Sequence, residues 1–385
     1  MKKQSLIVFL RRNYIEFEFI YPILNHLKKK FNIYFYFENE ISFTSLKNNE
    51  KNFICFKKIA KKYSIKKITD NFFRKILLKL LIKFDLFLKF RNKLINNIHS
   101  FTSICQKLSI KDLNNIKFIL SDINTNSQTL IELKKKAYPI KLFLFSPSPT
   151  NIQKSLIYKL KKNKFLFDKV DKILVPFFIK RKFFSNLIDT KKFVYIGNTI
   201  FANIKKKYKK KKIKQIVIAY NGDIKCSNDE IGFAEELIQL LRNYKDYKII
   251  IRFHPIKFSN NVLDIFKKYQ SKKLIVTKGN LITLVPNSSL FISSNDTAAI
   301  SYANYFNVPA LAFNNFSTKI NNDSFQVKKN LVKYCSNLNL LSKEIDKILF
   351  KKSILKKFQY NLFNKMYPKL NNQKKYFLQL FDCRT

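Results

Sequence analysis

Short apolar runs alternate with longer amphipathic stretches along most of this chain. Residues 5–10 and 31–37 are apolar runs of strand length, and residues 16–30 between them carry apolar side chains at helical spacing. A strand, a helix and a second strand at this pitch predict a βαβ unit in a parallel sheet. The same pattern predicts further strands at 117–120, 141–145, 172–175 and 193–198.

The alternation stops at a strongly basic stretch and then starts again. The sequence FANIKKKYKKKKIK fills residues 201–214, and a run of like charges this dense rarely enters a core, so we interpret it as a linker. Beyond it, apolar runs predict strands at 216–220, 248–253, 273–277, 289–293 and 308–313. Amphipathic stretches predict helices at 229–243, 260–270 and 297–305.

Two α/β halves joined by a linker predict two Rossmann-like domains, with a helical segment closing the chain. We expect an N-terminal domain at 1–198 with a long helical insert at 71–105, and a basic linker at 199–214. The second domain is expected at 215–345 and the closing helices at 346–385.

The net charge of +50, from 75 Lys and Arg against 25 Asp and Glu, is typical of nucleic-acid-binding proteins. However, Lys, Asn, Ile, Phe and Tyr are all enriched, whereas Gly is scarce and Trp is missing. That joint skew is what an AT-rich genome imposes through its codons, and no RNA-recognition, zinc or helix-turn-helix signature accompanies it. We therefore expect no specific nucleic acid and favour an anionic membrane surface, with a basic nucleic-acid-binding protein as the alternative.

Targeting and membrane signals are weak. The N-terminal apolar run has about five residues, fewer than a secretory signal needs, and no uncharged run approaches the length of a transmembrane helix. Residues 72–90 predict a basic amphipathic helix with Lys75, Lys79 and Lys83 on one stripe. Such a helix either lies in an anionic interface or faces a core. We expect a cytoplasmic protein, peripheral on the inner face of the cytoplasmic membrane.

The strand at 248–253 delivers two cationic or donor side chains to its carboxyl end. Arg252 is near the end of that strand, and His254 follows it directly before Pro255. Guanidinium and imidazole groups suit phosphate recognition through charge-assisted hydrogen bonds. The alternative is a capped turn with an incidental histidine.

Two more polar signatures follow strands of the second half. Ser293, Ser294 and Thr297 come at the end of the strand at 289–293. They fit a helix start that Ser294 or Asp296 caps, and equally a phosphate site. Asn221, Gly222 and Asp223 follow the first strand of this half, and there the alternative is an ordinary turn.

Carboxylates of the first half are candidates for a general base. Asp122 follows the strand at 117–120 and is our first choice, and Glu40 after the second strand is the second. Each is also what an ordinary loop carboxylate looks like. No carboxylate pair or Cys/His cluster with metal spacing stands out, so we expect no metal and no cofactor.

RFHP, followed by SSNDTAAISYANYFNVPALAF, resembles the HP and serine motifs of bacterial GT-B enzymes that use cytidine-activated donors. These are sialyl- and polysialyltransferases, capsule Kdo transferases and CDP-glycerol glycerophosphotransferases. The resemblance covers residues 170–315 and implies that His254, Ser293 and Ser294 contact the donor phosphate. The acidic-acidic-Gly motif of the sialyltransferases and the His-Gly of the glycerophosphotransferases are both absent from the first half.

The resemblance implies an inverting, metal-independent glycosyltransferase with a nucleotide-activated, CMP-linked sugar donor. Its acceptor would be lipid-linked or a polysaccharide, in lipopolysaccharide or capsule synthesis. A CDP-glycerol-type glycerophosphotransferase is the nearest alternative. An epimerase of nucleotide sugars with the same fold should carry additional carboxylates.

Overall fold

The computed structural model describes residues 3–11, 14–66, 101–123, 130, 139–146, 164–176, 184–197, 199–201, 213–220, 228–254, 258–294, 297, 299–314, 322, 324–351, 354–367 and 373–382. The chain forms two compact units, and we describe each by itself. Unit 1 comprises Met1–Asn203 and Lys369–Thr385, and unit 2 comprises Ile204–Pro368. Within the described residues, no helix combines the length and apolar character needed to cross a membrane.

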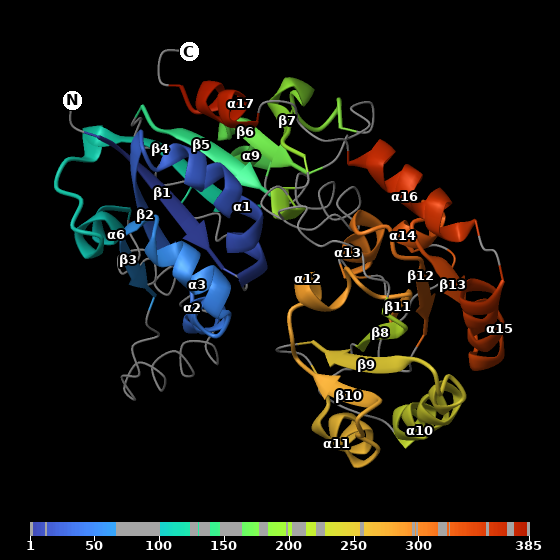
Figure 1. Ribbon diagram of the computed structural model, residues 1–385. Coiled ribbons are helices and arrows are strands. Elements are labelled where there is room, and N and C mark those ends of the chain that lie inside the picture. Colours follow the sequence, from blue (N-terminus) through green and yellow to red (C-terminus); the bar gives the residue numbers. More distant parts are fainter. Residues whose placement is uncertain are drawn as a thin grey trace, which may run out of the picture. The chain divides into compact units, whose positions relative to one another are not determined.

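Unit 1 is built on a parallel sheet with the strand order β3-β2-β1-β4-β5-β6-β7 (Figure 1). Runs of Phe, Ile, Leu and Tyr form its central strands because both faces of a parallel sheet are covered. The strands are β1 Gln4–Leu10, β2 Phe31–Phe37, β3 Ala60–Ile65, β4 Ile116–Asp122, β5 Lys141–Phe145, β6 Lys172–Val175 and β7 Phe193–Tyr195.

Helices of unit 1 connect these strands, and two of them begin at asparagine caps. The side chains of Asn39 and Asn49 accept hydrogen bonds from Ser42 N and Asn52 N, which starts α2 and α3. Gly197, after β7, has a φ of 69°, a conformation that glycine adopts without strain. The helices are α1 Tyr14–Leu27, α2 Glu40–Lys47, α3 Glu50–Lys57, α6 Phe101–Lys107, α9 Lys164–Lys169 and α17 Gln373–Leu380, with short 3-10 turns at Leu113–Asn115, Thr190–Lys192 and Thr199–Phe201.

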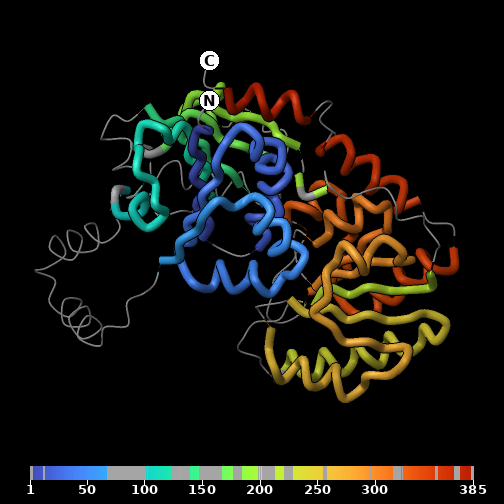
Figure 2. The backbone as a smooth tube through the Cα atoms, turned by 60° about the vertical axis from the view of Figure 1, so that its left-hand side comes forward, coloured from blue at the N-terminus to red at the C-terminus, as the bar shows by residue number. Residues whose placement is uncertain are grey.

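The end of the chain packs on unit 1, so this unit is made of two separate stretches of sequence (Figure 2). Phe381, just after α17, lies 5.1 Å from the ring of Phe118 and 4.9 Å from that of Phe143. Phe377 in α17 is fully buried as well. We had expected a closing helical segment, and its last helix belongs to the core of unit 1.

Unit 2 has a second parallel sheet, in the order β10-β9-β8-β11-β12-β13. The five strands that the apolar pattern predicts at 216–220, 248–253, 273–277, 289–293 and 308–313 are all present within two residues of those bounds. The strands are β8 Gln215–Tyr220, β9 Lys248–Phe253, β10 Leu274–Thr277, β11 Leu290–Ser293, β12 Ala310–Phe313 and β13 Lys333–Cys335.

Alternate residues of the unit 2 strands enter two separate cores. Ile218, Ile251 and Ile292 pack with α10, α11 and α15. Val217, Ile250 and Phe291 face the opposite way, toward α12 and α13. Because successive side chains of a strand point to opposite faces of the sheet, each strand contributes to both cores. The helices are α10 Asn228–Arg242, α11 Asn260–Lys268, α12 Leu281–Leu284, α13 Ala299–Tyr305, α14 Phe325–Lys328, α15 Leu338–Phe350 and α16 Leu355–Met366.

The structure confirms the predicted class, which is α/β with two Rossmann-like units and a helical C-terminal segment. The predicted helix at 297–305 begins at Ala299, and the closing segment expected at 346–385 contains the end of α15 together with α16 and α17. Most of the insert at 71–105, the amphipathic stretch at 72–90 and the basic run at 202–212 lie outside the described residues.

Candidate functional site

Both sheets have one point where the direction of winding reverses. In unit 1 it lies between β1 and β4, and in unit 2 between β8 and β11. Open α/β sheets bind ligands in the crevice outside the carboxyl ends of the strands at such a switch point. Residues at the carboxyl ends of these four strands and of their neighbours are therefore the first candidates for a site.

In unit 2 the strand register aligns Arg252 with Ser293 at this edge. Arg252 pairs with Ala219, and Ala219 pairs with Ser293, so the three lie side by side on β9, β8 and β11. Ala312 continues the row on β12 and Thr277 on β10. These residues share the sheet face that α12 and α13 cover. Small side chains therefore surround the arginine at the switch point.

Arg252 is a buried cation without a carboxylate partner among the described residues. Its side chain is only 6% exposed, and its Nε donates a hydrogen bond to the carbonyl of Gly279 at 3.2 Å. We find no further hydrogen bond or ion pair of this guanidinium with the described part of the chain. An uncompensated buried charge costs several kcal/mol, so it is retained where a ligand supplies the opposite charge.

The turn after β10 holds Arg252 in place. Gly279 N donates to the Thr277 hydroxyl at 3.0 Å, and Asn280 caps α12 by accepting from Ile282 N at 3.0 Å. A Cβ at Gly279 would lie 3.2 Å from the Thr277 hydroxyl oxygen, closer than such atoms usually approach. A glycine at this position allows the tight turn, and the turn aims its carbonyl at Arg252.

His254 and Ser294 flank the end of β8. His254 N donates to Tyr220 O at 3.3 Å, and Ser294 N donates to Ala219 O at 3.1 Å. His254 is half-buried, whereas the side chains of Ser293 and Ser294 are fully buried. The structure thus brings the predicted histidine and serines to one strand end. Asn221, Gly222 and Asp223, which follow β8 directly, lie outside the described residues.

Thr297 lies two residues before the start of helix α13 (Ala299–Tyr305). Its hydroxyl accepts a hydrogen bond from Ala299 N at 3.4 Å, and its carbonyl accepts one from Gln326 Nε2 at 2.6 Å. The sequence suggested Ser294 or Asp296 as the cap. Thr297 makes the contact because α13 begins at Ala299, two residues later than predicted. This leaves Ser294 paired with β8 through its backbone.

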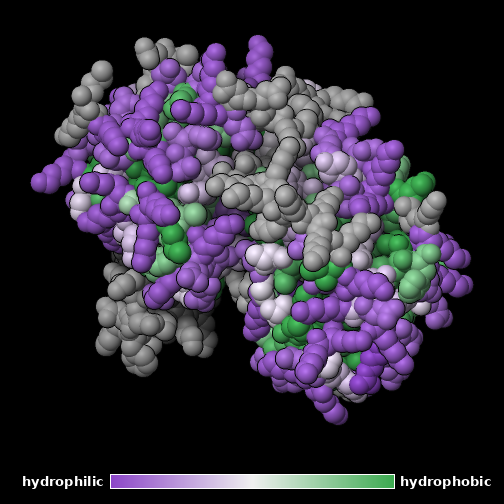
Figure 3. Space-filling model, in the orientation of Figure 1, coloured by the Kyte–Doolittle hydropathy of each residue, from purple (hydrophilic) through white to green (hydrophobic). Residues whose placement is uncertain are grey.

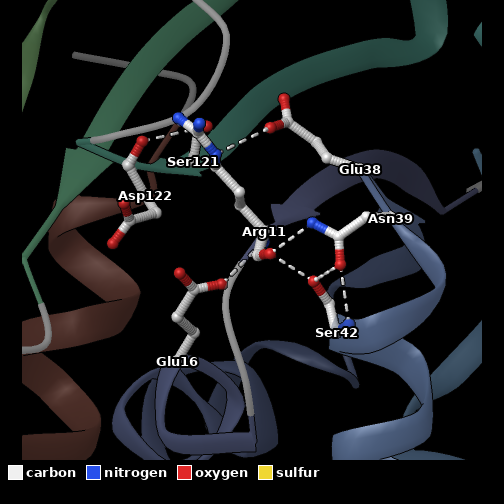
Figure 4. A network of polar contacts seen from close by, with 7 residues as sticks. All are labelled: Arg11, Glu16, Glu38, Asn39, Ser42, Ser121 and Asp122. Atoms are coloured by element: carbon white, nitrogen blue, oxygen red, sulfur yellow. Dashed lines mark hydrogen bonds and ion pairs between the residues drawn. The ribbon is translucent and has the colours of Figure 1, made fainter. Parts of the chain in front are cut away.

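A polar network occupies the corresponding edge of unit 1. Figure 4 shows Arg11 after β1, with side chains from α1, β2, α2 and β4 around it. The Arg11 guanidinium extends toward Glu38, with Nε 4.0 Å from a carboxylate oxygen. Arg11 N donates to Glu16 at 2.7 Å, and its carbonyl accepts from Asn39 at 2.7 Å and from the Ser42 hydroxyl. Neither Arg11 nor Glu16 is among the site residues predicted from the sequence. A charged residue directly after the first strand is the signal for the former.

The two predicted base candidates have very different surroundings. Asp122 is the last residue of β4 and is fully buried, beside the buried Ser121. Glu40 lies in the first turn of α2 and is exposed to solvent, so it does not follow β2 as a loop residue. Glu38, at the end of β2, is largely buried and belongs to the network. Burial, together with the neighbouring Glu38 carboxylate, raises the pKa of the Tyr36 phenol to about 12.

A cavity of about 400 Å³ opens at the carboxyl edge of unit 2, beyond β12 and β13. Its lining combines the side chains of Asn314, Ser336 and Asn339 with the Glu236 carboxylate and the Phe233 ring. Among the residues that the structure describes, no cluster of His, Cys, Asp and Glu has the composition to hold a metal ion.

No protein-family model matches this sequence, and no curated protein matches it. Solved structures do match its fold over nearly the whole chain. The UDP-GlcNAc 2-epimerase of Neisseria meningitidis bound to UDP-GlcNAc is 12% identical, with 98% of this chain and 99% of that chain covered and a TM-score of 0.60. The Medicago truncatula UGT complexed with UDP-glucose is 14% identical, with 98% and 97% covered and a TM-score of 0.63. The glycotransferase of kitacinnamycin is 9% identical, with 99% of each chain covered and a TM-score of 0.57. The chain therefore has the GT-B fold.

Proposed function

We propose that this chain is an enzyme of nucleotide sugars, and that it transfers a sugar from a nucleotide-activated donor. The observation that carries the proposal is Arg252, a buried guanidinium without a carboxylate partner in the described part of unit 2. It lies beside the switch point of a parallel sheet, where this class of fold binds ligands. A donor phosphate would supply the missing negative charge.

The donor-binding residues follow from the same edge of unit 2. Arg252 and His254 would contact the phosphate, with Ser293, Ser294 and Thr297 beside it. Asn221, Gly222 and Asp223, which follow β8 in the sequence, are further candidates for donor binding. Two of the similar structures contain UDP-GlcNAc and UDP-glucose, which supports a nucleotide sugar as the ligand. The choice of a CMP-linked donor rests on the resemblance of RFHP and SSNDT to enzymes with cytidine-activated donors.

The proposed reaction inverts the configuration of the sugar and needs no metal. An acceptor hydroxyl attacks the anomeric carbon, a carboxylate takes its proton, and the bonding electrons leave with the nucleotide phosphate. Arg252 and His254 stabilise that developing charge, a role for which a metal ion is otherwise used. Asp122 is the proposed base because it ends β4 at the switch point of unit 1, and Glu40 remains the second choice.

We place this reaction in lipopolysaccharide or capsule synthesis, with a lipid-linked or polysaccharide acceptor. The enzyme would work in the cytoplasm, peripheral to the inner face of the cytoplasmic membrane. No cofactor is proposed.

Titration with CMP, UMP and UDP, followed by donor-hydrolysis assays, tests this proposal. We expect CMP to bind more tightly than UMP and CMP-sugars to be hydrolysed, with a chelator leaving the rate unchanged. Turnover of CDP-glycerol instead would indicate a glycerophosphotransferase. Turnover of UDP-sugars alone would exclude the cytidine donor.

A second candidate is an epimerase of nucleotide sugars. The observation that favours it is the group of carboxylates in unit 1, where Glu16 and Asp122 are buried and Glu38 is largely buried. Moving a proton on and off a sugar carbon requires such acid and base groups. An epimerase would change the configuration of UDP-GlcNAc without releasing UDP and without an acceptor, whereas a transferase would not.

A further inference from the structure

We propose that the amino edge of the unit 2 sheet docks on an anionic phospholipid bilayer. The surface consists of a cavity with lysines and the exposed apolar side chains around it, and we call it the docking edge. It lies at the opposite end of the strands from Arg252, so it is a separate site and does not rest on the proposed function. Its residues are Ile213, Lys214, Phe350, Lys351, Ile354, Lys356 and Phe358.

The cavity has a volume of about 390 Å³ and is formed by segments that lead into the strands. Lys214 precedes β8, Tyr247 precedes β9, Ser289 precedes β11 and Pro309 precedes β12. The end of α15 and the start of α16 complete its wall with Ile348, Leu349, Lys351 and Lys356. All of these residues belong to unit 2.

The polar lining of this cavity suits a phosphate. Lys214, Lys351 and Lys356 line it, and none of its described lining residues is acidic. Lys214 has one exposed partner outside the lining, Asp246 at 3.7 Å. Asn287 and Asn307 also line the cavity, and their side-chain oxygens are buried without a hydrogen-bond partner. A half-turn of an amide exchanges its oxygen and its NH2 group, so both asparagines can offer donors to an anion.

Large apolar side chains are exposed on the segments that form this cavity or directly adjoin it. Ile354 is 83% exposed, Phe350 65%, Phe358 47% and Ile213 45%. Ile213 N bonds to Asn287 O at 3.3 Å, and the Phe350 ring lies 6.3 Å from that of Tyr247, so both adjoin the lining. Ile354 and Phe358 lie one helical turn apart on one face of α16, and Lys356, two residues from each, projects from another side of the helix. Figure 3 shows hydrophobic atoms beside hydrophilic ones over the connection between α15 and α16.

This combination identifies a bilayer as the occupant. Apolar side chains that surround lysines can enter the acyl boundary while the ammonium groups stay at the level of the lipid phosphates. A free phosphate would occupy the cavity and leave four apolar side chains in water. The net charge of +50 draws the chain toward anionic lipid as well, although that attraction alone would favour no particular face.

Sedimentation of the full chain with phosphatidylcholine vesicles, with and without phosphatidylserine, tests the proposal. The variant Ile354→Ser/Phe358→Ser should bind the phosphatidylserine vesicles more weakly by a factor on the order of ten. The control Ile41→Ser/Ile54→Ser removes exposed apolar residues of unit 1 and should bind like the parent. Because all four side chains are exposed, melting curves should show every variant folded.

A second pair of variants separates the docking edge from the general charge. Lys351→Gln/Lys356→Gln should lose about fivefold in binding for each lysine. The control Lys268→Gln/Lys272→Gln removes the same charge from an exposed part of unit 2 and should lose far less. The chain contains no tryptophan, so Ile354→Trp supplies a single tryptophan, which can be excited selectively over the tyrosines. Its emission should shift to the blue on phosphatidylserine vesicles, whereas that of Ile41→Trp should not.

Three outcomes would overturn the proposal. The parent stays in the supernatant with phosphatidylserine vesicles, or each double variant binds like its control. Alternatively, the Ile354→Trp emission shifts without vesicles as the protein concentration rises, which would make this edge a contact between copies of the chain.

Discussion

Arg252 combines two properties that rarely occur together in a single side chain. It is buried at the end of a central strand, and in the described residues its one hydrogen bond goes to a neutral carbonyl, that of Gly279. A side chain selected for stability alone would be apolar here, as its strand neighbours Ile249, Ile250 and Ile251 are. Stability and activity should therefore respond in opposite directions when its charge is removed.

We expect Arg252→Met to lower donor turnover by a factor of about 10²–10³, the usual loss of one electrostatic stabiliser. The melting temperature should stay the same or rise, because replacing a buried charge with an apolar side chain of similar volume removes a desolvation cost. Donor kinetics and calorimetry would measure both effects. Arg252→Lys, which keeps the charge but lacks the planar fork, should retain part of the activity. A Met variant that is fully active, or that unfolds, would remove Arg252 from the proposed role.

Ser294 and Thr297 allow a matched comparison between binding and capping. Thr297→Ala should cost about 1 kcal/mol of stability, since its hydroxyl accepts from the first helical N–H of α13. Ser294→Ala should instead weaken donor binding mildly and leave the melting temperature close to the parent value. Binding titrations and thermal melts of both variants decide the matter. The phosphate role of Ser294 fails if its variant loses only stability.

The sequence indicated part of this site and could not indicate the rest. His254, Arg252 and Ser293 could be proposed from the sequence because each lies at the end of an apolar run, and the sequence alone shows where such a run ends. Arg252 lies in a row with Ala219 and Ser293 because of the register between the strands. The hydrophobic pattern of a single strand does not determine that register. Nothing in the sequence around Ala219 indicates that it lies between Arg252 and Ser293.

At the scale of elements, α17 is the least expected feature of unit 1. Phe381 inserts between two strands' aromatic side chains, Phe118 and Phe143, and is itself fully buried. Phe381→Ala should lower the free energy of unfolding of unit 1 by about 3–5 kcal/mol, the range for deleting a buried phenylalanine. Urea unfolding measures it. Phe358→Ala, at an exposed position, should change it by less than about 0.5 kcal/mol. If both variants changed the free energy of unfolding equally, Phe381 would not be packed in the core of unit 1.

Glu344 joins β13 to α15 and makes unit 2 sensitive to acid. Burial works against its ionisation, but Lys333 and Lys347, each 2.8 Å away, outweigh it and lower the pKa of this carboxyl. Its contribution to stability is therefore present above the ordinary pKa of a glutamate and is lost as the pH falls through the lowered value. The free energy of unfolding of the parent, measured with urea, should therefore decrease across that acid range. Glu344→Gln should be less stable at neutral pH and less dependent on pH.

The elements predicted best from the sequence were those with a clear hydrophobic pattern. Strands β2, β5, β6 and β9 have the predicted bounds, because each is an apolar run between charged or turn residues. Helices α2 and α3 and strand β3 were missed. The eight residues of α2, EISFTSLK, carry too few apolar positions, and β3 is an edge strand with two lysines. An edge strand needs apolar residues on fewer sides than a central one, so its pattern is weak.

At the scale of the whole molecule, the charge of +50 predicts weak and indiscriminate binding to nucleic acid. We expect the affinity for double-stranded DNA to fall steeply as salt rises, and to be similar for unrelated sequences, because phosphate contacts carry no sequence information. Fluorescence anisotropy at several salt concentrations would measure this. Tight binding of one sequence at physiological salt would instead support a nucleic-acid-binding protein.

The return of the chain end to unit 1 also affects the order in which the two units can fold. Unit 2 is one continuous stretch, Ile204–Pro368, so it can form as soon as those residues leave the ribosome. Unit 1 must wait, because the aromatic side chains Phe118 of β4 and Phe143 of β5 stay uncovered until Phe381 has been synthesised. During that interval unit 1 exposes an apolar surface. A chaperone that covers this surface, or the rate at which the segment with Phe381 is translated, would therefore affect folding most at that stage.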